Sequence, residues 1–204
     1  MGSASQADFG APKELEVMEA VLNVDFKSGK LSGPQVTHTV RRLGDLKGIF
    51  LNQEAFQEKS ETEIIYQVQY FQPVGEGQEG GLFWGNTLIE PGQVGDEYYM
   101  TKGHFHAKRD RGEYYIGVAG EGALILMDDS GKTWFENMKP GSVHYIPGRT
   151  AHRVANVGSI QLAFLACWPS DAGHDYETIA QSGFSARLLN QDGKPVLVGK
   201  ALDS

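Results

Sequence analysis

The stretch TKGHFHAKRDRGEYY, residues 101–115, contains two of the six histidines of the chain, His104 and His106, and Glu113 follows seven residues after the second. Side chains alternate between the two faces of a strand, so an extended backbone would place both imidazoles on one side, roughly 7 Å apart at Cα. The polar segment AKRDRG is typical of a turn, and EYYIGVAG is typical of a new strand that begins at Glu113. Such a hairpin would return the carboxylate to the imidazoles, and it predicts a metal site.

A fourth ligand is sought among the three histidines of the second half, His144, His152 and His174. His152 is the best candidate because it follows the turn PGRTA and opens the strand HRVANV, which would place it at the mouth of a β fold. Three neutral imidazoles and one carboxylate suit Fe²⁺, Mn²⁺, Ni²⁺, Co²⁺ or Zn²⁺ better than an oxygen-seeking ion such as Ca²⁺.

The composition sets the broad class. With 204 residues, 40% of them hydrophobic, the chain is long enough for one sizeable domain with its own core. Its 18 basic and 26 acidic residues form no like-charge run, so neither nucleic acid nor an anionic membrane is an expected partner. The single cysteine, Cys167, excludes an intrachain disulfide and a thiolate cluster. Without an apolar leader or spanning segment, the chain is expected to be cytoplasmic.

Short alternating segments separated by glycine-bearing turns predict an all-β fold built from antiparallel hairpins. The segments are VLNVDF, VTHTV, EIIYQVQYF, NTLIE, EYYIGVAG, ALILMD, HRVANV and IQLAFLACW. Two short helices are expected, at residues 51–59 and 175–182, the second capped by Asp175. The glycine-rich residues 73–81 lack the ending of a phosphate-binding loop and are expected to be a connector.

The order of glycines, prolines and candidate ligands resembles the two motifs of the cupin superfamily. The matching positions are Pro91, Gly92, His104, His106, Glu113, Gly120, Gly141, Pro147, His152 and Asn156. Two departures stand out: six residues separate His106 from Glu113, more than is usual in cupins, and Arg149 occupies the place of a glycine. Both departures resemble one branch, the cupin-type phosphoglucose isomerases.

The resemblance to this branch runs from about Val24 to Val198. It is carried by VRRLGDLKGIF, EPGQVGDEYYMTKGHFHAK and WPSDAGHDYETIAQSGFS, of which the first and last are absent from generic cupins. It implies a single cupin isomerase domain at residues 24–204, a double-stranded β-helix or jelly-roll barrel with a few short peripheral helices. Residues 1–23 would be an N-terminal tail or extension.

The resemblance also implies the roles of individual residues. The metal ligands would be His104, His106, Glu113 and His152. The substrate phosphate would be bound by Tyr66, Thr87, Thr101, Gly103 and Tyr176, while Tyr115 and His174 would face the sugar. Hydroxyls and backbone N–H groups would thus hold the anion in a chain of net charge −8. His38 and His144 match no family role and are expected to be structural, and Cys167 to pack as a small hydrophobe.

The implied activity is the metal-dependent interconversion of glucose 6-phosphate and fructose 6-phosphate by a homodimer. Glu113 would be the catalytic base of an enediol route with His174 moving protons, and a metal-assisted hydride shift is the open alternative. Open coordination positions favour Fe²⁺ or Mn²⁺, with Ni²⁺, Co²⁺ or Zn²⁺ as other options. Mannose 6-phosphate epimerisation also stays open. Two rival functions are a cupin dioxygenase or oxalate-type oxidoreductase, and a non-catalytic sugar-phosphate sensor or storage-type cupin.

Overall fold

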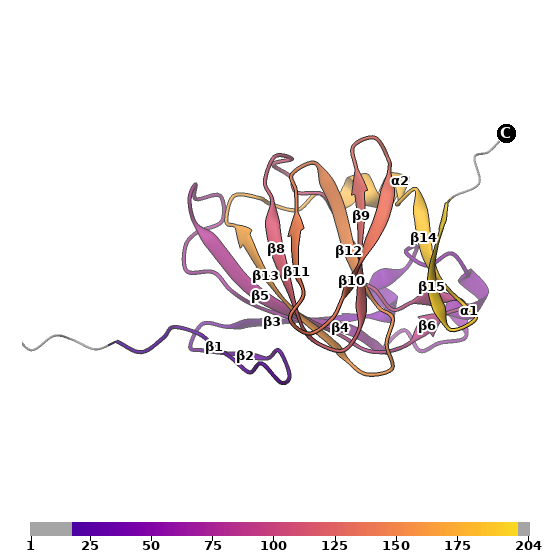
Figure 1. The fold of residues 1–204 in the computed structure, drawn as a ribbon, viewed down its shortest axis with the longest axis horizontal. Helices are drawn as coiled ribbons and strands as arrows, with labels where there is room; N and C mark the ends of the chain where they lie inside the picture. The colour runs from indigo at the N-terminus through magenta and orange to yellow at the C-terminus, as the bar shows by residue number, and fades with distance from the viewer. Residues whose placement is uncertain (1–17, 200–204) are drawn as a thin grey trace, which may run out of the picture.

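The computed structural model describes residues 18–199 and confirms the all-β class (Figure 1). Two short α-helices, α1 (Gln53–Gln57) and α2 (Tyr176–Ser182), and one 3-10 turn, η1 (Leu43–Leu46), accompany the strands. The strands are β1 (Asn23–Val24), β2 (Leu31–Ser32), β3 (Thr37–Arg42), β4 (Ile64–Phe71), β5 (Leu82–Ile89), β6 (Gln93–Val94), β7 (Glu97–Tyr98), β8 (Glu113–Ala119), β9 (Gly122–Asp128), β10 (Thr133–Met138), β11 (Val143–Ile146), β12 (Thr150–Asn156), β13 (Leu162–Pro169), β14 (Ala186–Gln191) and β15 (Lys194–Gly199).

Two antiparallel sheets form the barrel. The first has the order β11-β8-β13-β5-β4-β3, and the second has the order β10-β9-β12. The extended segment 100–104 continues the second sheet, because Met100 pairs with Ala155 and His104 pairs with His152. The six-stranded sheet and the three-stranded sheet with its extended segment, joined by connections that cross between the two layers, make the predicted jelly-roll barrel.

Strands β9 and β12 are the most buried strands of the second sheet. Every residue of β12 is buried, as is every residue of β9 except Asp128. One face of these strands points into the barrel, and the C-terminal segment covers the other, where the Arg153 guanidinium stacks 3.9 Å from the centre of the Phe184 ring. Full burial of a leucine such as Leu124 or Leu126 contributes about 1.5–3 kcal/mol to the free energy of unfolding.

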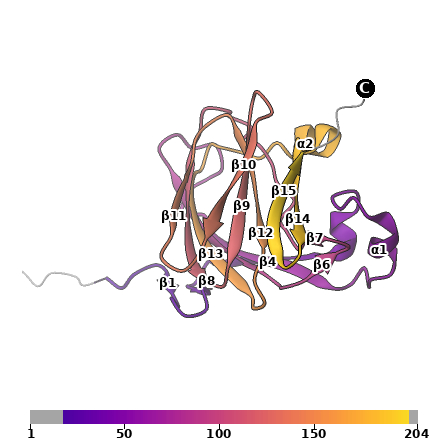
Figure 2. The ribbon, with the colours of Figure 1, turned by 45° about the vertical axis from the view of Figure 1, so that its right-hand side comes forward.

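A small four-stranded sheet of order β15-β14-β7-β6 lies beside β12 (Figure 2). Its anchor is Glu97, whose side chain is 4% exposed and pairs with the Arg187 guanidinium at 2.6 Å. The second carboxylate oxygen of Glu97 accepts a hydrogen bond from the backbone N–H of Leu51. The pair therefore fastens the C-terminal hairpin to the chain just before α1.

The N-terminal hairpin of β1 and β2 is hydrogen-bonded to the six-stranded sheet, with the Asn86 amide donating to the Gly29 carbonyl. Residues 1–17, most of the predicted N-terminal tail, lie outside the described residues, as do residues 200–204. The boundaries 1–23 and 24–204 therefore stay a prediction. No helix among residues 18–199 is long and apolar enough to cross a membrane.

The segment around the histidine pair departs from the expected continuous strand. Residues 101–106 contain only isolated bridges, from His104 to His152 and from Phe105 to Asp175. Gly103 has φ +78°, which breaks the regular pleat just before His104.

The predicted cap of the second helix is confirmed, since the Asp175 side chain accepts from the Thr178 N–H at 3.0 Å.

Candidate metal centre and active-site pocket

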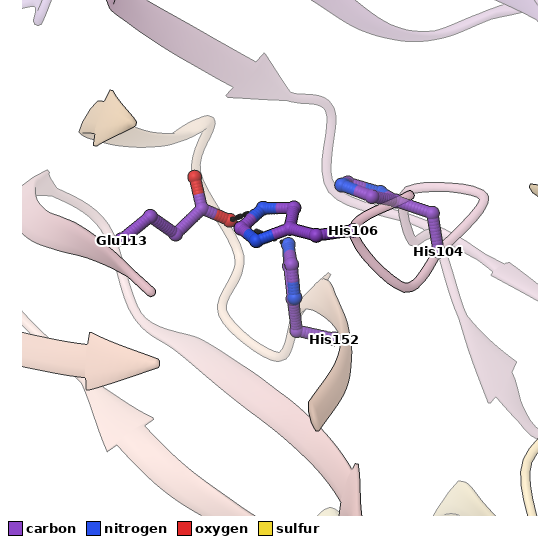
Figure 3. Close-up of side chains that lie close together, drawn as sticks. All are labelled: His104, His106, Glu113 and His152. Carbon is purple, nitrogen blue, oxygen red and sulfur yellow. Dashed lines mark ion pairs between the residues drawn. The ribbon is translucent and has the colours of Figure 1, made fainter. Parts of the chain in front are cut away.

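The four predicted ligands converge inside the barrel, as Figure 3 shows. Their potential ligand atoms all lie within 4.8 Å of one another. Glu113 Oε1 lies 3.5 Å from His106 Nε2 and 2.5 Å from His152 Nε2. Residues 48 positions apart in the sequence, His104 and His152, meet because their backbones pair across the second sheet. The first sheet supplies Glu113, the first residue of β8, where the sequence predicts a new strand.

Backbone carbonyls fix the orientation of two of the imidazole rings. His106 Nδ1 donates to the Arg111 carbonyl at 2.7 Å, and His152 Nδ1 donates to the Thr150 carbonyl at 3.3 Å. A carbonyl oxygen only accepts, so each Nδ1 carries the proton and each Nε2 presents its lone pair to the centre. This is the common arrangement of metal-binding histidines.

The atoms at the centre lack the hydrogen-bond partners that burial normally requires. His106 Nε2, Glu113 Oε1 and His152 Nε2 are buried without a hydrogen bond among the described residues. A buried polar atom left unpaired costs about 1–3 kcal/mol. A divalent cation would satisfy all three acceptors together with His104, so this donor set fits a metal ion of the imidazole-preferring type.

Electrostatics at the centre favour the neutral form of His104 and the ionised form of Glu113, which are the forms that bind a metal. Burial raises the pKa of Glu113, but His152 and His106 outweigh it, and the carboxyl pKa falls below its usual range. Burial, with His152 and His174 close by, lowers the pKa of His104 well below its usual value. His106 is the exception, because its contacts with Glu113 outweigh burial and raise its pKa. A carboxylate binds a metal in its ionised form and an imidazole binds it in its neutral form.

A cavity of about 540 Å³ opens onto this centre, large enough for a small ligand. The structure brings every predicted substrate-binding residue to its wall, namely Tyr66, Thr87, Thr101, Gly103, Tyr115 and Tyr176, together with His174. Of the four candidate ligands, His104, Glu113 and His152 line the cavity, whereas His106 lies behind it. The roles assigned to these residues stay predictions.

At one end of the cavity, local backbone geometry keeps hydrogen-bond donors available. Thr101 Oγ1 accepts from the Val154 N–H at 3.1 Å, which leaves the hydroxyl hydrogen free to donate. A Cβ on Gly103 would lie 3.0 Å from the Phe184 ring and 3.1 Å from Arg153 Cβ. This close approach and the positive φ at Gly103 both call for glycine.

The sugar-facing candidates keep distinct protonation states. His174 and Tyr176 stack at 5.6 Å between ring centres with 9° between planes. Burial lowers the pKa of His174, which favours a neutral imidazole able to accept a proton. Burial and then Glu113 raise the pKa of Tyr115 well above its usual value, so its phenol stays a donor.

Two cations on the cavity wall were missed from the sequence, Arg41 and Lys102. Arg41 lies on β3 directly opposite Tyr66 on β4. The alternation of Thr39 and Arg41, which both line the cavity, was an available signal in the segment THTVRR. Burial and then Tyr176 raise the pKa of Tyr66 to about 12, so this phenol is also protonated beside the arginine.

The residues predicted to be structural lie elsewhere. His144 is 5% exposed, and its two ring nitrogens contact Glu136 Oε2 at 2.7 Å and Ser142 Oγ at 2.9 Å. The His38 ring lies 3.2 Å from the Gln69 amide nitrogen. Cys167 is a free thiol, half-buried on β13.

A jelly-roll barrel with three histidines and one glutamate converging at the end of a cavity defines a cupin whose side-chain cluster could hold a metal ion. Residues 40–201 match the family described as glucose-6-phosphate isomerase (GPI). The chain is 44% identical over 179 residues to the glucose-6-phosphate isomerase of Pyrococcus horikoshii, covering 87% of this chain and 93% of that protein. It is 34% identical over 178 residues to that of Sinorhizobium medicae, covering 86% and 82%. The chain belongs to the glucose-6-phosphate isomerase family.

Among solved structures, the oxalate decarboxylase of Bacillus subtilis aligns with a TM-score of 0.42 and 20% identity, covering 54% of this chain and 26% of that one.

Proposed function

We propose that this protein is a metal-dependent glucose-6-phosphate isomerase that interconverts glucose 6-phosphate and fructose 6-phosphate. The observation that carries the proposal is the four-ligand cluster in a cavity whose wall also holds Arg41, Lys102 and several hydroxyls. Membership of the glucose-6-phosphate isomerase family supports the choice of substrate. The proposal extends to a cytoplasmic homodimer acting in glycolysis and gluconeogenesis.

The metal would be held by His104, His106, Glu113 and His152, with Fe²⁺ or Mn²⁺ preferred and Ni²⁺, Co²⁺ or Zn²⁺ as alternatives. When bound, a divalent cation supplies Lewis-acid polarisation of the sugar oxygens at C1 and C2.

The phosphate would lie at the end of the cavity formed by Tyr66, Thr87, Thr101, Gly103 and Tyr176. Two hydroxyls there are available to donate, because Thr101 accepts from the backbone and the pKa of Tyr66 is raised. Arg41 and Lys102 add positive charge on the same wall. This local positive charge would allow a chain with a net charge of −8 to bind a dianionic sugar phosphate.

Glu113 is proposed to take the proton from C2 of the open-chain aldose and return it to C1. Its lowered pKa keeps it ionised at neutral pH, and its neighbour Tyr115 stays protonated as a hydrogen-bond donor. His174, neutral on the cavity wall, would move the proton between O2 and O1 and assist ring opening. In the alternative hydride-shift route no side chain takes the C2 hydrogen.

The deciding experiment is turnover of fructose 6-phosphate by chelator-stripped protein before and after addition of Fe²⁺, Mn²⁺, Ni²⁺, Co²⁺ or Zn²⁺. Activity restored by a metal supports the isomerase and ranks its ions. Stoichiometric metal binding without turnover for any ion would overturn the proposal and redirect work to oxygen-consumption assays.

The same assay in D₂O separates the two chemical routes. Deuterium that enters the product at the carbon that receives the hydrogen supports proton transfer through a side chain. Complete retention of the substrate hydrogen over many turnovers would instead support the hydride shift.

A further inference from the structure

The loop 107–112, which joins the histidine pair to Glu113, is fastened along its length to the segment 171–175. The Lys108 N–H donates to the Ala172 carbonyl at 2.9 Å, and the Ala107 N–H donates to the Gly173 carbonyl at 3.4 Å. The bridge between Phe105 and Asp175 continues this contact toward the histidine pair. The two segments are thus hydrogen-bonded side by side next to the candidate metal centre.

Asp171 is the charged anchor of this contact. Its side chain is 3% exposed and lies between two cations. Lys108 Nζ lies 2.8 Å from the carboxylate. The Arg111 guanidinium donates two hydrogen bonds to it, from its outer nitrogen at 2.8 Å and from Nε at 3.1 Å. Such fork geometry holds the guanidinium in one orientation. Neither Asp171 nor Arg111 lines the cavity, so neither side chain is placed to contact a substrate.

Arg111 connects this ion pair to the metal centre through its own backbone. Its carbonyl accepts the hydrogen bond from His106 Nδ1 at 2.7 Å, while its guanidinium is bound by Asp171. Because both contacts belong to one residue, the orientation of the His106 ring depends on the position that Asp171 imposes on Arg111. The chain of contacts therefore runs from Asp171 through Arg111 to His106 Nε2.

We propose that Asp171 is a positioning residue of the metal centre, which fixes His106 as a ligand by holding Arg111. The inference rests on the proposed metal site. It also gives a purpose to the long six-residue gap between His106 and Glu113, because both cations that bind Asp171 lie within that gap. Groups that orient metal ligands typically change metal affinity by about 10–100-fold when they are replaced.

The test measures Mn²⁺ affinity of the full chain directly, from the electron paramagnetic resonance signal of the free ion. Asp171→Asn keeps the shape of the side chain and removes its charge, and we expect about 10–100-fold weaker Mn²⁺ binding. Arg111→Lys keeps the carbonyl and one positive charge but loses the fork, so we expect an intermediate loss. Lys108→Met removes only the arm that is 52% exposed and is expected to stay within threefold of the unmodified chain.

Asp25→Asn is the matched control, because this exposed carboxylate also accepts hydrogen bonds, from Lys27 N–H and Ser28 Oγ–H, but lies in the N-terminal hairpin. Its Mn²⁺ affinity is expected to be unchanged. A purely structural Asp171 would lower the thermal midpoint of Asp171→Asn with Mn²⁺ affinity retained within twofold, and that result would overturn the inference.

Where Asp171→Asn shows no cooperative unfolding, Arg111→Lys and Arg111→Gln replace it, and unchanged Mn²⁺ affinity in both would be equally decisive against the inference. Absence of binding by the unmodified chain of Mn²⁺ and of each of the other proposed ions would overturn the metal site itself, a failure that is visible before any variant is compared.

Discussion

Glu113 has two proposed tasks, as a metal ligand and as the base that moves the C2 proton. Glu113→Gln keeps an oxygen at the position but removes the charge that His106 and His152 stabilise. We expect turnover to fall by about 10²–10⁴-fold at saturating metal. Metal content is measured on the same sample, so that loss of the base is separated from loss of the ion. Full turnover with metal bound would remove Glu113 from the proton-transfer step.

Arg41 is expected to contribute binding more than chemistry, because it lies at the Tyr66 side of the cavity and does not belong to the ligand cluster. Arg41→Gln should raise KM for the sugar phosphate about tenfold, the equivalent of about 1.4 kcal/mol, with a smaller change in kcat. Its effect should shrink as salt is raised, since exposed charges are screened. Lys47→Gln, an exposed charge outside the cavity lining, is the control. An unchanged KM would place the phosphate elsewhere.

At the residue scale, the metal cluster was predicted from the sequence, whereas the place of Arg41 on the cavity wall was not. The two-residue periodicity of a strand places His104 and His106 on one side, and a polar turn before Glu113 brings the carboxylate back. Arg41 is about sixty residues away from the histidine pair in the sequence, and only the pairing of β3 with β4 brings it beside Tyr66. The local periodicity of a segment does not show which distant strand it pairs with.

At the element scale, Gly103 breaks the segment before the histidine pair. Gly103→Ala should lower the free energy of unfolding by about 1–2 kcal/mol from backbone conformation alone, and further from contacts with Phe184 and Arg153. Gly48→Ala is the matched control, because Gly48 has φ +84° and no atom within 4 Å of an added Cβ. Denaturant unfolding of both variants separates the two costs. An equal loss in the two variants would mean that the tight packing at Gly103 contributes nothing.

The buried strands β12 and β13 were predicted from the sequence, whereas two half-polar edge strands were not. The segments HRVANV and IQLAFLACW lie in β12, in which every residue is buried, and in β13, in which the first four residues are buried. The strand β10, with the sequence TWFENM and only one fully buried residue, and β15, with none, were not predicted. Both are edge strands of their sheets, where exposure weakens the alternation of apolar and polar residues.

Arg149 shows how a departure from a motif is accommodated within an element. It has φ +61° in the turn between β11 and β12, where the cupin motif has a glycine. The turn keeps its left-handed backbone although the side chain has changed, and Arg149 pairs with Asp129 at 3.1 Å. The conformation of the turn, and not the identity of the residue, brings His152 to the start of its strand.

At the scale of the whole molecule, the Asp171 ion pairs should contribute to stability against acid. Arg111 and then Lys108 hold the pKa of Asp171 below its usual value. A depressed pKa gives stability that is present above the unfolded-state pKa of about 3.9 and is lost as the pH falls through the folded-state value. Asp171→Asn should therefore show a flatter decline of the thermal midpoint below about pH 4 than the unmodified chain. Parallel midpoint curves for the two proteins would contradict this.

The ligand set also has a consequence for how the chain reaches its folded state. The four ligands come from both sheets, with His104 and His152 in one and Glu113 at the start of a strand in the other. No local piece of the chain contains the complete set, and a metal site is rarely formed in an unfolded chain. Tight uptake of a cation at this cluster would therefore be a late event in folding, and it would mark those molecules in which both layers of the barrel have closed.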